Sequence, residues 1–312
     1  MNAVVDFPTL ITSRTYSQIA FEFDREFATL FSWMKPTPRP CFNPTLLEEI
    51  QRSERLIELH QGHFNDGGRP ARIDYAVFGS RVPGVFNLGG DLNMFIAAIM
   101  RKDKALLADY GRICVDNQYR RATGFGAQIT TVALVEGKAL GGGFEAALAC
   151  DLIVAERNAT FALPEVLFNL FPGMGALSFL ARKIGPKKAE EVIMSGRVFS
   201  AREMYDLHVV DEVVEDGLGL ETVRQLIAHR RRRQNAYRAM QRAKHCFHPI
   251  DFNELNSIVD VWVDATMQLD ARDLRMMARL VRAQDRLMIA TPEDSAFDAM
   301  FGDAALLVAS NG

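Results

Sequence analysis

The sequence has 312 residues, of which 48% are hydrophobic and 24% are charged. This composition is ordinary for a packed soluble protein, and it excludes a disordered chain, a collagen-like chain and a small disulfide scaffold. Thirty-six basic and thirty-nine acidic side chains give a formal net charge of -3. The molecule as a whole therefore carries no field that would attract nucleic acid or an anionic membrane, and any contact with a polyanion must be local.

The cysteines and the N-terminus indicate a cytoplasmic protein. Cys41, Cys114, Cys150 and Cys246 form no C-x-x-C pair, which predicts four reduced thiols rather than a zinc or redox motif. Asp6 lies where a secretory signal would carry Lys or Arg, and every apolar run is shorter than the about 18 residues of a membrane span. We expect a chain that stays in the cytoplasm and spans no membrane.

The N-terminal part shows strand signals on both sides of a helix signal. Residues 16–35 alternate and then become apolar, which predicts a pair of strands. Asn43 followed by Pro44 predicts a helix start, and the helical spacing continues to about residue 60. A buried strand over 75–78 and a loop over 82–91 follow. The pattern then predicts one helix over 92–121.

The middle of the chain has the order of an α/β protein. A strand over 129–135 leads into three glycines, which are followed by a helix over 144–149 and strands over 152–155 and 160–163. Next come helices over 176–184 and 186–194, a capping box formed by Ser200 and Glu203, and a strand over 209–214. The fold class predicted from this order is α/β.

The remaining pattern is helical, with predicted helices over 222–242, 255–269 and 274–281. We therefore expect two parts. Residues 1–215 form a mixed core that begins with the hairpin, and residues 216–312 form a C-terminal helical region.

Two glycine loops are candidates for an oxyanion hole. Gly142 lies at a helix start, where backbone N–H groups are unpaired, and Gly90 lies in a loop just before another helix. If the fold brings them together, both N–H groups can bind one carbonyl oxygen of an ester or thioester. The alternative is that Gly141–Gly143 only allow a helix and a strand to pack closely.

Two glutamates are candidates for acid and base catalysis. Glu145 lies on the first turn of the helix that Gly142 opens, and Glu165 follows Pro164 at the end of a strand. Two carboxyl groups facing a polarised carbonyl could remove a proton from the α carbon and protonate an oxygen at the β carbon. The alternative for each is a solvated surface charge. The apolar residues around Glu145 argue against it.

Four motifs in this order resemble the crotonase (enoyl-CoA hydratase/isomerase) superfamily over about residues 75–214: Gly89-Gly90-Asp91, Gly141-Gly142-Gly143-Phe144-Glu145, Leu163-Pro164-Glu165 and Pro172-Gly173-Met174-Gly175. The resemblance implies a ββα spiral core, acyl thioester substrates, no cofactor, and assembly into homotrimers or hexamers. It also implies that Gly90 and Gly142 supply the oxyanion amides and that Glu145 and Glu165 are the catalytic pair. Gly173 would lie beside the reacting water.

Further segments are similar to a narrower group, the diffusible signal factor synthases, over most of residues 16–287: Trp33-Met34-Lys35-Pro36, Arg39-Pro40-Cys41-Phe42, Cys114-Val115-Asp116-Asn117, the loop from Phe168 to Gly175, and Val261-Trp262-Val263-Asp264-Ala265. This resemblance implies a substrate that acyl carrier protein presents as a 3-hydroxyacyl thioester. The enzyme would dehydrate it to a cis-2-enoyl chain and cleave the thioester, releasing an unsaturated fatty acid used in quorum sensing.

An acyl chain would need an apolar pocket, for which we predict Met174, Leu177, Trp262, Met276 and Met277. The alternative is that these residues are simply core.

The basic run over 229–233 is either solvated or a docking site for an acidic carrier protein, and nucleic acid is the least favoured partner. The histidines at 60, 63, 245 and 248 lack further ligands, so we expect no metal site.

Two other functions stay open. An ordinary enoyl-CoA hydratase or isomerase of fatty-acid metabolism would keep the thioester intact. A catalytically silent protein would bind acyl groups, or bind and regulate a sensor kinase.

Overall fold

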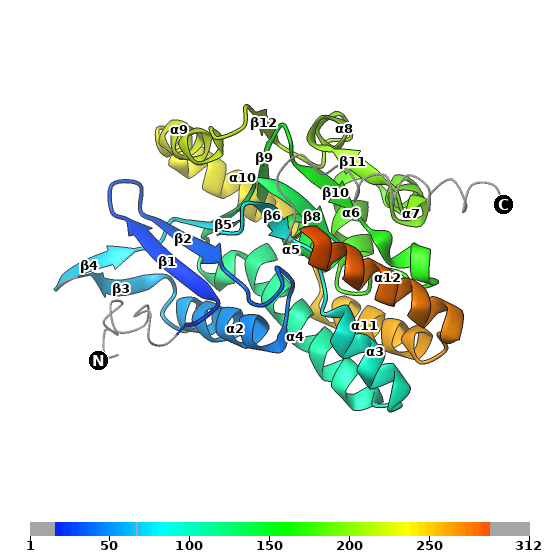
Figure 1. Ribbon diagram of the computed structural model, residues 1–312. Coiled ribbons are helices and arrows are strands. Elements are labelled where there is room, and N and C mark those ends of the chain that lie inside the picture. The colour runs from blue at the N-terminus through cyan, green and yellow to red at the C-terminus, as the bar shows by residue number, and fades with distance from the viewer. Residues whose placement is uncertain (1–15, 67, 288–312) are drawn as a thin grey trace.

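The computed structural model describes residues 16–66 and 68–287 (Figure 1). The expectations for Asp6 and for the last 25 residues lie outside these ranges. In these ranges the helices alternate with the strands or follow them. The α-helices are α2 (Pro44–Leu59), α3 (Leu92–Met100), α4 (Lys104–Ala122), α5 (Gly142–Leu148), α6 (Ala176–Ile184), α7 (Pro186–Ser195), α8 (Ala201–Asp206), α9 (Gly219–Arg231), α10 (Gln234–Phe247), α11 (Phe252–Thr266) and α12 (Ala271–Leu287). Two short 3-10 helices are η1 (Gly124–Gly126) and η2 (Pro164–Phe168).

A six-stranded sheet forms one layer of the centre. Its strands lie in the order β1 (Ile19–Asp24), β2 (Thr29–Met34), β5 (Tyr75–Ser80), β7 (Thr130–Val135), β9 (Leu152–Glu156) and β12 (Glu212–Val214). The β1–β2 hairpin is antiparallel, and every later pair is parallel. All six residues of β7 are buried, as expected for a parallel strand covered on both faces.

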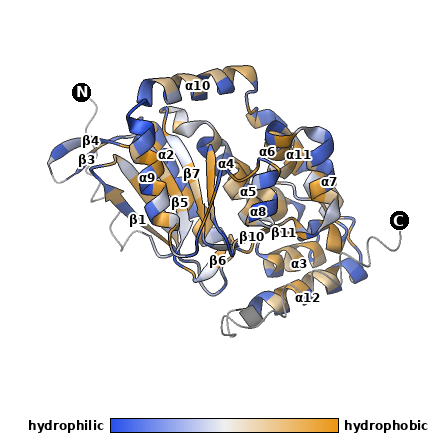
Figure 2. Ribbon diagram, turned by 90° about the horizontal axis from the view of Figure 1, so that it is seen from above, coloured by the Kyte–Doolittle hydropathy of each residue, from blue (hydrophilic) through white to orange (hydrophobic). Residues whose placement is uncertain are grey.

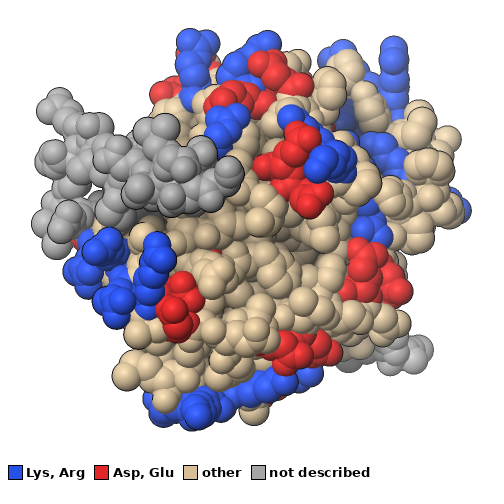
Figure 3. Space-filling view, turned by 90° about the vertical axis from the view of Figure 1, so that its right-hand side faces the viewer, with Lys and Arg blue, Asp and Glu red and all other residues tan. Residues whose placement is uncertain are grey.

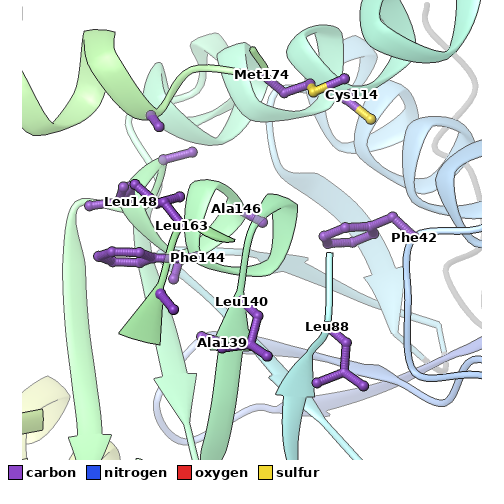
Figure 4. Packing of buried hydrophobic residues seen from close by; sticks show 14 of the residues in the cluster. Phe42, Leu88, Cys114, Ala139, Leu140, Phe144, Ala146, Leu148, Leu163 and Met174 are labelled. Atoms are coloured by element: carbon purple, nitrogen blue, oxygen red, sulfur yellow. The ribbon is translucent and has the colours of Figure 1, made fainter. Parts of the chain in front are cut away.

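A four-stranded sheet forms a second layer, in the order β11 (Val198–Ser200), β10 (Thr160–Ala162), β8 (Gly137–Leu140) and β6 (Gly84–Asn87). The short hairpin of β3 (His63–Asp66) and β4 (Arg69–Arg72) stands apart from both sheets. Helix α5 contacts β6, β7 and β8, so it lies where strands of the two sheets meet. The largest hydrophobic core surrounds it, and Figure 4 shows Phe144, Ala146 and Leu148 of α5 within that core.

Two C-terminal helices pack against α3 and α4. α11 packs on α4, and α12 packs on α3 and on η2 (Figure 1). α10 differs from them because none of its residues is buried, and Figure 2 shows it along one margin of the molecule. On the face shown in Figure 3, the described charged side chains of both signs surround a broad uncharged area. Within the described ranges, no helix is both long and apolar enough to cross a membrane.

The structure confirms the predicted α/β class and corrects several boundaries. One helix over 92–121 is wrong: Lys102 takes a positive φ of 56°, and the Asp103 side chain caps a new helix by accepting from the N–H of Leu106. One helix over 222–242 is also wrong, since the chain breaks between α9 and α10. The loop predicted over 82–91 contains β6, and the strand predicted over 209–214 is limited to β12.

Candidate active site

The two glycine loops lie against each other. A Cβ atom built on Gly142 would lie 3.6 Å from the amide nitrogen of Gly90. Gly89 and Gly141 have positive φ values of 94° and 50°, which glycine adopts without steric cost. α5 begins at Gly142, so the N–H of this residue has no partner within the helix.

Neither the N–H of Gly90 nor that of Gly142 donates a hydrogen bond to any residue in the described part of the chain. Two free amides this close together can bind the same carbonyl oxygen and stabilise negative charge on it.

Glu145 projects from the first turn of α5 and is only 1% exposed. Its Oε1 accepts hydrogen bonds from the backbone N–H groups of Met174, at 2.9 Å, and Ala176, at 3.1 Å. Burial raises the pKa of this carboxyl to about 7, although the two amide hydrogen bonds act in the opposite direction by stabilising its charged form. Glu145 can therefore exchange a proton near neutral pH.

Glu165 approaches the same region from another element. β10 ends at Ala162, and Pro164 starts the short helix η2, whose first turn holds Glu165. One carboxylate oxygen lies 2.6 Å from where a Cβ of Gly141 would be, so a side chain at position 141 would displace this carboxylate. The other oxygen, Oε2, is buried without a hydrogen-bond partner. Burial and then the charge of Glu145 raise the pKa of Glu165 to about 8.

The two pKa values imply that the pair holds at least one proton near neutral pH. Glu145 has two amide donors that favour its charged form, whereas Glu165 has an unpartnered oxygen and the higher pKa. A proton held by the pair therefore belongs mainly to Glu165. One carboxylate and one carboxylic acid beside an oxyanion hole are the groups that acid–base chemistry next to a carbonyl requires.

One cavity of about 600 Å³, counted with its open mouth, joins these groups. Both glutamates, both oxyanion glycines, Gly173, Met174 and Trp262 line it. Most of its remaining wall is apolar, and Figure 4 shows Phe42, Cys114 and Met174 among these wall residues. The apolar part of the wall consists of Phe42, Leu47, Leu92, Phe95, Tyr110, Cys114, Ala146, Phe168, Leu170, Pro172, Met174 and Trp262.

Three residues predicted for the acyl pocket lie outside this cavity. Leu177 is 40% exposed, because it lies on the outer face of α6. Met277 is fully buried in the main core, and Met276 packs against that core from a partly buried position. Helical periodicity indicates that such residues lie on a buried face of a helix, but it does not show whether they line the cavity or fill the core.

Sequence analysis missed a group of polar residues on α4. Asn117, Gln118 and Arg121 line the same cavity and are at most 4% exposed. With Tyr110 and Cys114 they share one helical face, since their spacing follows steps of three and four residues. The signal available in the sequence was that these polar residues recur at helical spacing on the same face as Tyr110 and Cys114.

The remaining predicted features are distributed as follows. The four cysteines are free, as predicted. In the described ranges no three His, Cys, Asp or Glu side chains gather closely enough to hold a metal ion. Within the basic run over 229–233, Arg231 donates a hydrogen bond to the backbone carbonyl of Glu26. Arg238, which follows the run, forms an ion pair with Asp74 at 2.6 Å.

Comparison with known proteins adds a family match. The model of the enoyl-CoA hydratase/isomerase family matches residues 69–282. The probable mitochondrial enoyl-CoA hydratase 2 of Arabidopsis thaliana is 32% identical over 185 residues, which cover 59% of this chain and 55% of that protein. A probable enoyl-CoA hydratase of Bacillus subtilis is 34% identical over 131 residues, covering 42% of this chain and 48% of that protein. The chain thus spans about half the length of these curated relatives.

A solved structure supports the fold. The crystal structure of a putative enoyl-CoA hydratase from Streptomyces avermitilis superposes with a TM-score of 0.69, covering 93% of this chain and 96% of that one. The two sequences are 20% identical, so this similarity concerns the fold alone. It agrees with the predicted crotonase-like core followed by a C-terminal helical region.

Proposed function

Because the chain belongs to the enoyl-CoA hydratase/isomerase family, we propose that its cavity catalyses the dehydration of 3-hydroxyacyl thioesters. The observation that carries this proposal is the pair of buried glutamates in one cavity with two free backbone amides. The cavity also has an apolar wall suited to an acyl chain, and α5 supplies both Gly142 and Glu145 to the same point.

The proposed reaction uses each of these groups. The N–H groups of Gly90 and Gly142 bind the thioester carbonyl oxygen and stabilise the enolate that forms when the α carbon loses its proton. One glutamate, as carboxylate, takes that proton. The other, as carboxylic acid, protonates the β hydroxyl, which leaves as water while the C=C bond forms. The pair holds the same number of protons before and after the step.

We further propose that the substrate is carried by acyl carrier protein and that the product leaves as a free cis-2-enoic acid. In the second step a water oxygen bonds to the carbonyl carbon, the C–S bond breaks, and the departing thiol takes a proton. The same two amides would stabilise the oxyanion of this step. The resemblance to diffusible signal factor synthases supports this narrower function, which would make the product a quorum-sensing signal.

A docking surface for the carrier protein is part of this proposal. Carrier proteins of acidic character would be attracted to exposed basic side chains that form no ion pair with another described residue, such as those of Arg232, Arg233 and Arg242. These residues lie at the end of α9 and on α10. Assembly into trimers or hexamers and a sensor-kinase partner stay predictions from the family resemblance.

The second candidate is an enoyl-CoA hydratase or isomerase that leaves the thioester intact. The family match and the similarity to two probable enoyl-CoA hydratases favour it. The same cavity would serve, because water addition to an enoyl thioester is the reverse of the dehydration described above. The two candidates differ in the carrier and in the fate of the thioester.

Incubation with a 3-hydroxyacyl carrier protein, followed by mass spectrometry, separates the candidates. A free unsaturated fatty acid is the result expected for the synthase. An unsaturated chain still attached to its carrier would support the hydratase and overturn thioester cleavage. A parallel incubation with the matching 3-hydroxyacyl-CoA tests the carrier preference. If no dehydration of either thioester occurs, the proposed reaction is wrong.

A further inference from the structure

The loop that carries Gly90 depends on two hydrogen bonds to the residue before it. The carbonyl of Gly89 accepts from the N–H of Phe42 at 2.7 Å, and the N–H of Gly89 donates to Oδ1 of Asn87 at 2.8 Å. The first bond orients the planar peptide unit that contains the free N–H of Gly90, and the second orients the peptide unit before it. Gly89 lies between the two units with a φ of 94°, and a glycine can adopt many other angles. Both bonds therefore help to direct the N–H of Gly90.

Asn87 also contacts the second glycine loop. It is the last residue of β6 and is fully buried. A Cβ atom built on Gly143 would lie 2.1 Å from the backbone carbonyl oxygen of Asn87, so the start of α5 packs directly against this residue. A Cβ atom built on Gly89 would in turn lie 3.1 Å from the amide nitrogen of Gly142. The backbone of Asn87 thus packs against the loop of Gly142, while its side chain binds the loop of Gly90.

The chemistry of asparagine fits this position. A buried polar side chain is costly unless it is hydrogen-bonded. The Nδ2 atom of Asn87 donates to the Sδ of Met34 at 3.6 Å, and a thioether is a weak acceptor, so the bond to Gly89 is the stronger one. An asparagine side chain that binds the N–H two residues later closes a turn of the backbone. A carboxylate could close the same turn, but its charge would oppose the negative charge that the N–H of Gly90 is proposed to stabilise.

We propose that Asn87 is a positioning residue for the dehydration: by binding the N–H of Gly89, it keeps the free N–H of Gly90 directed at the thioester carbonyl oxygen. This inference rests on the proposed function and adds a residue to it. Asn87 is not among the residues that line the cavity, so it acts through the loop and not on the substrate. Without its side-chain oxygen, the N–H of Gly89 would be buried and unpaired. The glycine would then turn toward another partner and take the N–H of Gly90 with it.

The kinetic test compares three variants in the dehydration of a 3-hydroxyacyl thioester. Asn87→Leu keeps the size of the side chain and removes the acceptor, so kcat should fall by about 10- to 10²-fold while KM changes little, because the amide matters most in the transition state. Asn87→Ser should restore part of the loss, since a hydroxyl can also accept from the N–H two residues later. Ser80→Ala is the matched control. Ser80 ends β5 outside the cavity, and its Oγ accepts from the N–H of Val82 at 3.1 Å. This variant should keep the wild-type kcat.

Infrared spectroscopy of a bound ketone separates positioning from a merely structural role. In this saturated analogue CH2 replaces the thioester sulfur, so it can be neither dehydrated nor hydrolysed, and its carbonyl is isotope-labelled. Hydrogen bonds to a carbonyl oxygen lower its stretching frequency. The frequency should therefore be higher in Asn87→Leu than in wild type, with Asn87→Ser between them.

An unchanged frequency in Asn87→Leu, with or without a fall in kcat, would overturn the inference and leave the dehydration proposal standing. The reverse result is equally distinct: a shifted frequency in a protein that dehydrates no 3-hydroxyacyl thioester would support the positioning by Asn87 and overturn the reaction. If Asn87→Leu fails to fold, the frequency in Asn87→Ser against wild type decides the question.

Discussion

At the end of the cavity beside Gly90 and Gly142, the polar groups are backbone amides and two glutamates that approach from separate elements. On the side of the cavity formed by α4 they are side chains of one helix, and among the described residues Arg121 forms an ion pair with Glu54. The first end depends on unusual backbone conformations, such as the positive φ of Gly141. The second needs only ordinary helical geometry.

The contrast also appears in how each end treats buried charge. Arg121 and Glu54 form a neutral ion pair, whereas no basic side chain of the described residues pairs with Glu145 or Glu165. Burial raises the pKa of Glu54 as well as those of Glu145 and Glu165, but at Glu54 the charge of Arg121 opposes the rise. Near neutral pH the carboxyls beside Gly90 and Gly142 can exchange protons, whereas Arg121 stays charged beside Glu54.

The largest effect is expected when one of the two carboxyls beside Gly90 and Gly142 is removed. Glu145→Gln or Glu165→Gln keeps the shape of the side chain but removes its ability to take or give a proton. We expect dehydration, measured as kcat/KM, to fall by about 10²- to 10⁴-fold in either variant. Unchanged product formation would instead support the catalytically silent protein that binds acyl groups.

Glu156 provides a matched control for that experiment. It is also buried, at 5% exposed, and its Oε1 also accepts from two backbone N–H groups, those of Gly217 and Gly219. It lies outside the cavity. Glu156→Gln should lower stability while leaving kcat/KM near the wild-type value, so an equal loss of activity would assign the effect to folding.

A smaller effect is expected from removal of one oxyanion donor. Gly142 is the first residue of α5, a position that tolerates proline, so Gly142→Pro removes the N–H at a site compatible with the helix. We expect kcat/KM to fall by about 10²- to 10³-fold. Gly142→Ala keeps the N–H, and its Cβ would have only ordinary contacts, the nearest at 3.6 Å. Similar losses in both variants would show that space, not hydrogen bonding, is limiting.

Much of the fold followed from local sequence signals. The alternation before residue 35, the Asn43–Pro44 helix start and the Ser200–Glu203 capping box all correspond to elements in the structure. The failures occurred where short strands or breaks depend on distant partners. β6 forms by pairing with the distant strand β8, and the break before α4 depends on a single left-handed residue, Lys102.

The residues of the site likewise divide into those that the sequence could predict and those that it could not. The end beside Gly90 and Gly142 was predictable because its glycines and glutamates occur in short motifs whose order resembles a known family. Arg121 was not predictable as a cavity residue, since its partner Glu54 is 67 positions away in the chain. The positions of Leu177, Met276 and Met277 likewise depend on how α6 and α12 pack, which apolar periodicity alone does not determine.

The smallest effect concerns stability and pH at the catalytic end. The folded-state pKa of Glu165, about 8, lies above its ordinary value of 4.5. A raised pKa means that folding favours the protonated form, so the associated stability is present at low pH and is lost as the pH rises from about 4.5 through about 8. Glu165→Gln cannot ionise and avoids this loss. Its stability relative to wild type should therefore increase by up to a few kcal/mol between about pH 5 and about pH 8.5.

Urea unfolding of both proteins at the two pH values measures this difference, and Glu203 supplies a control of opposite sign. Burial acts to raise the pKa of Glu203, but hydrogen bonds from Ser200 and Arg197 outweigh it and lower the pKa. The stability that Glu203 contributes is present above its unfolded-state pKa and is lost as the pH falls. Glu203→Gln should thus lose stability relative to wild type as the pH rises through the range below about 4.5, and should change little between about pH 5 and about pH 8.5. If Glu165→Gln and Glu203→Gln responded to pH in the same direction, the catalytic carboxyl would not be held protonated by burial.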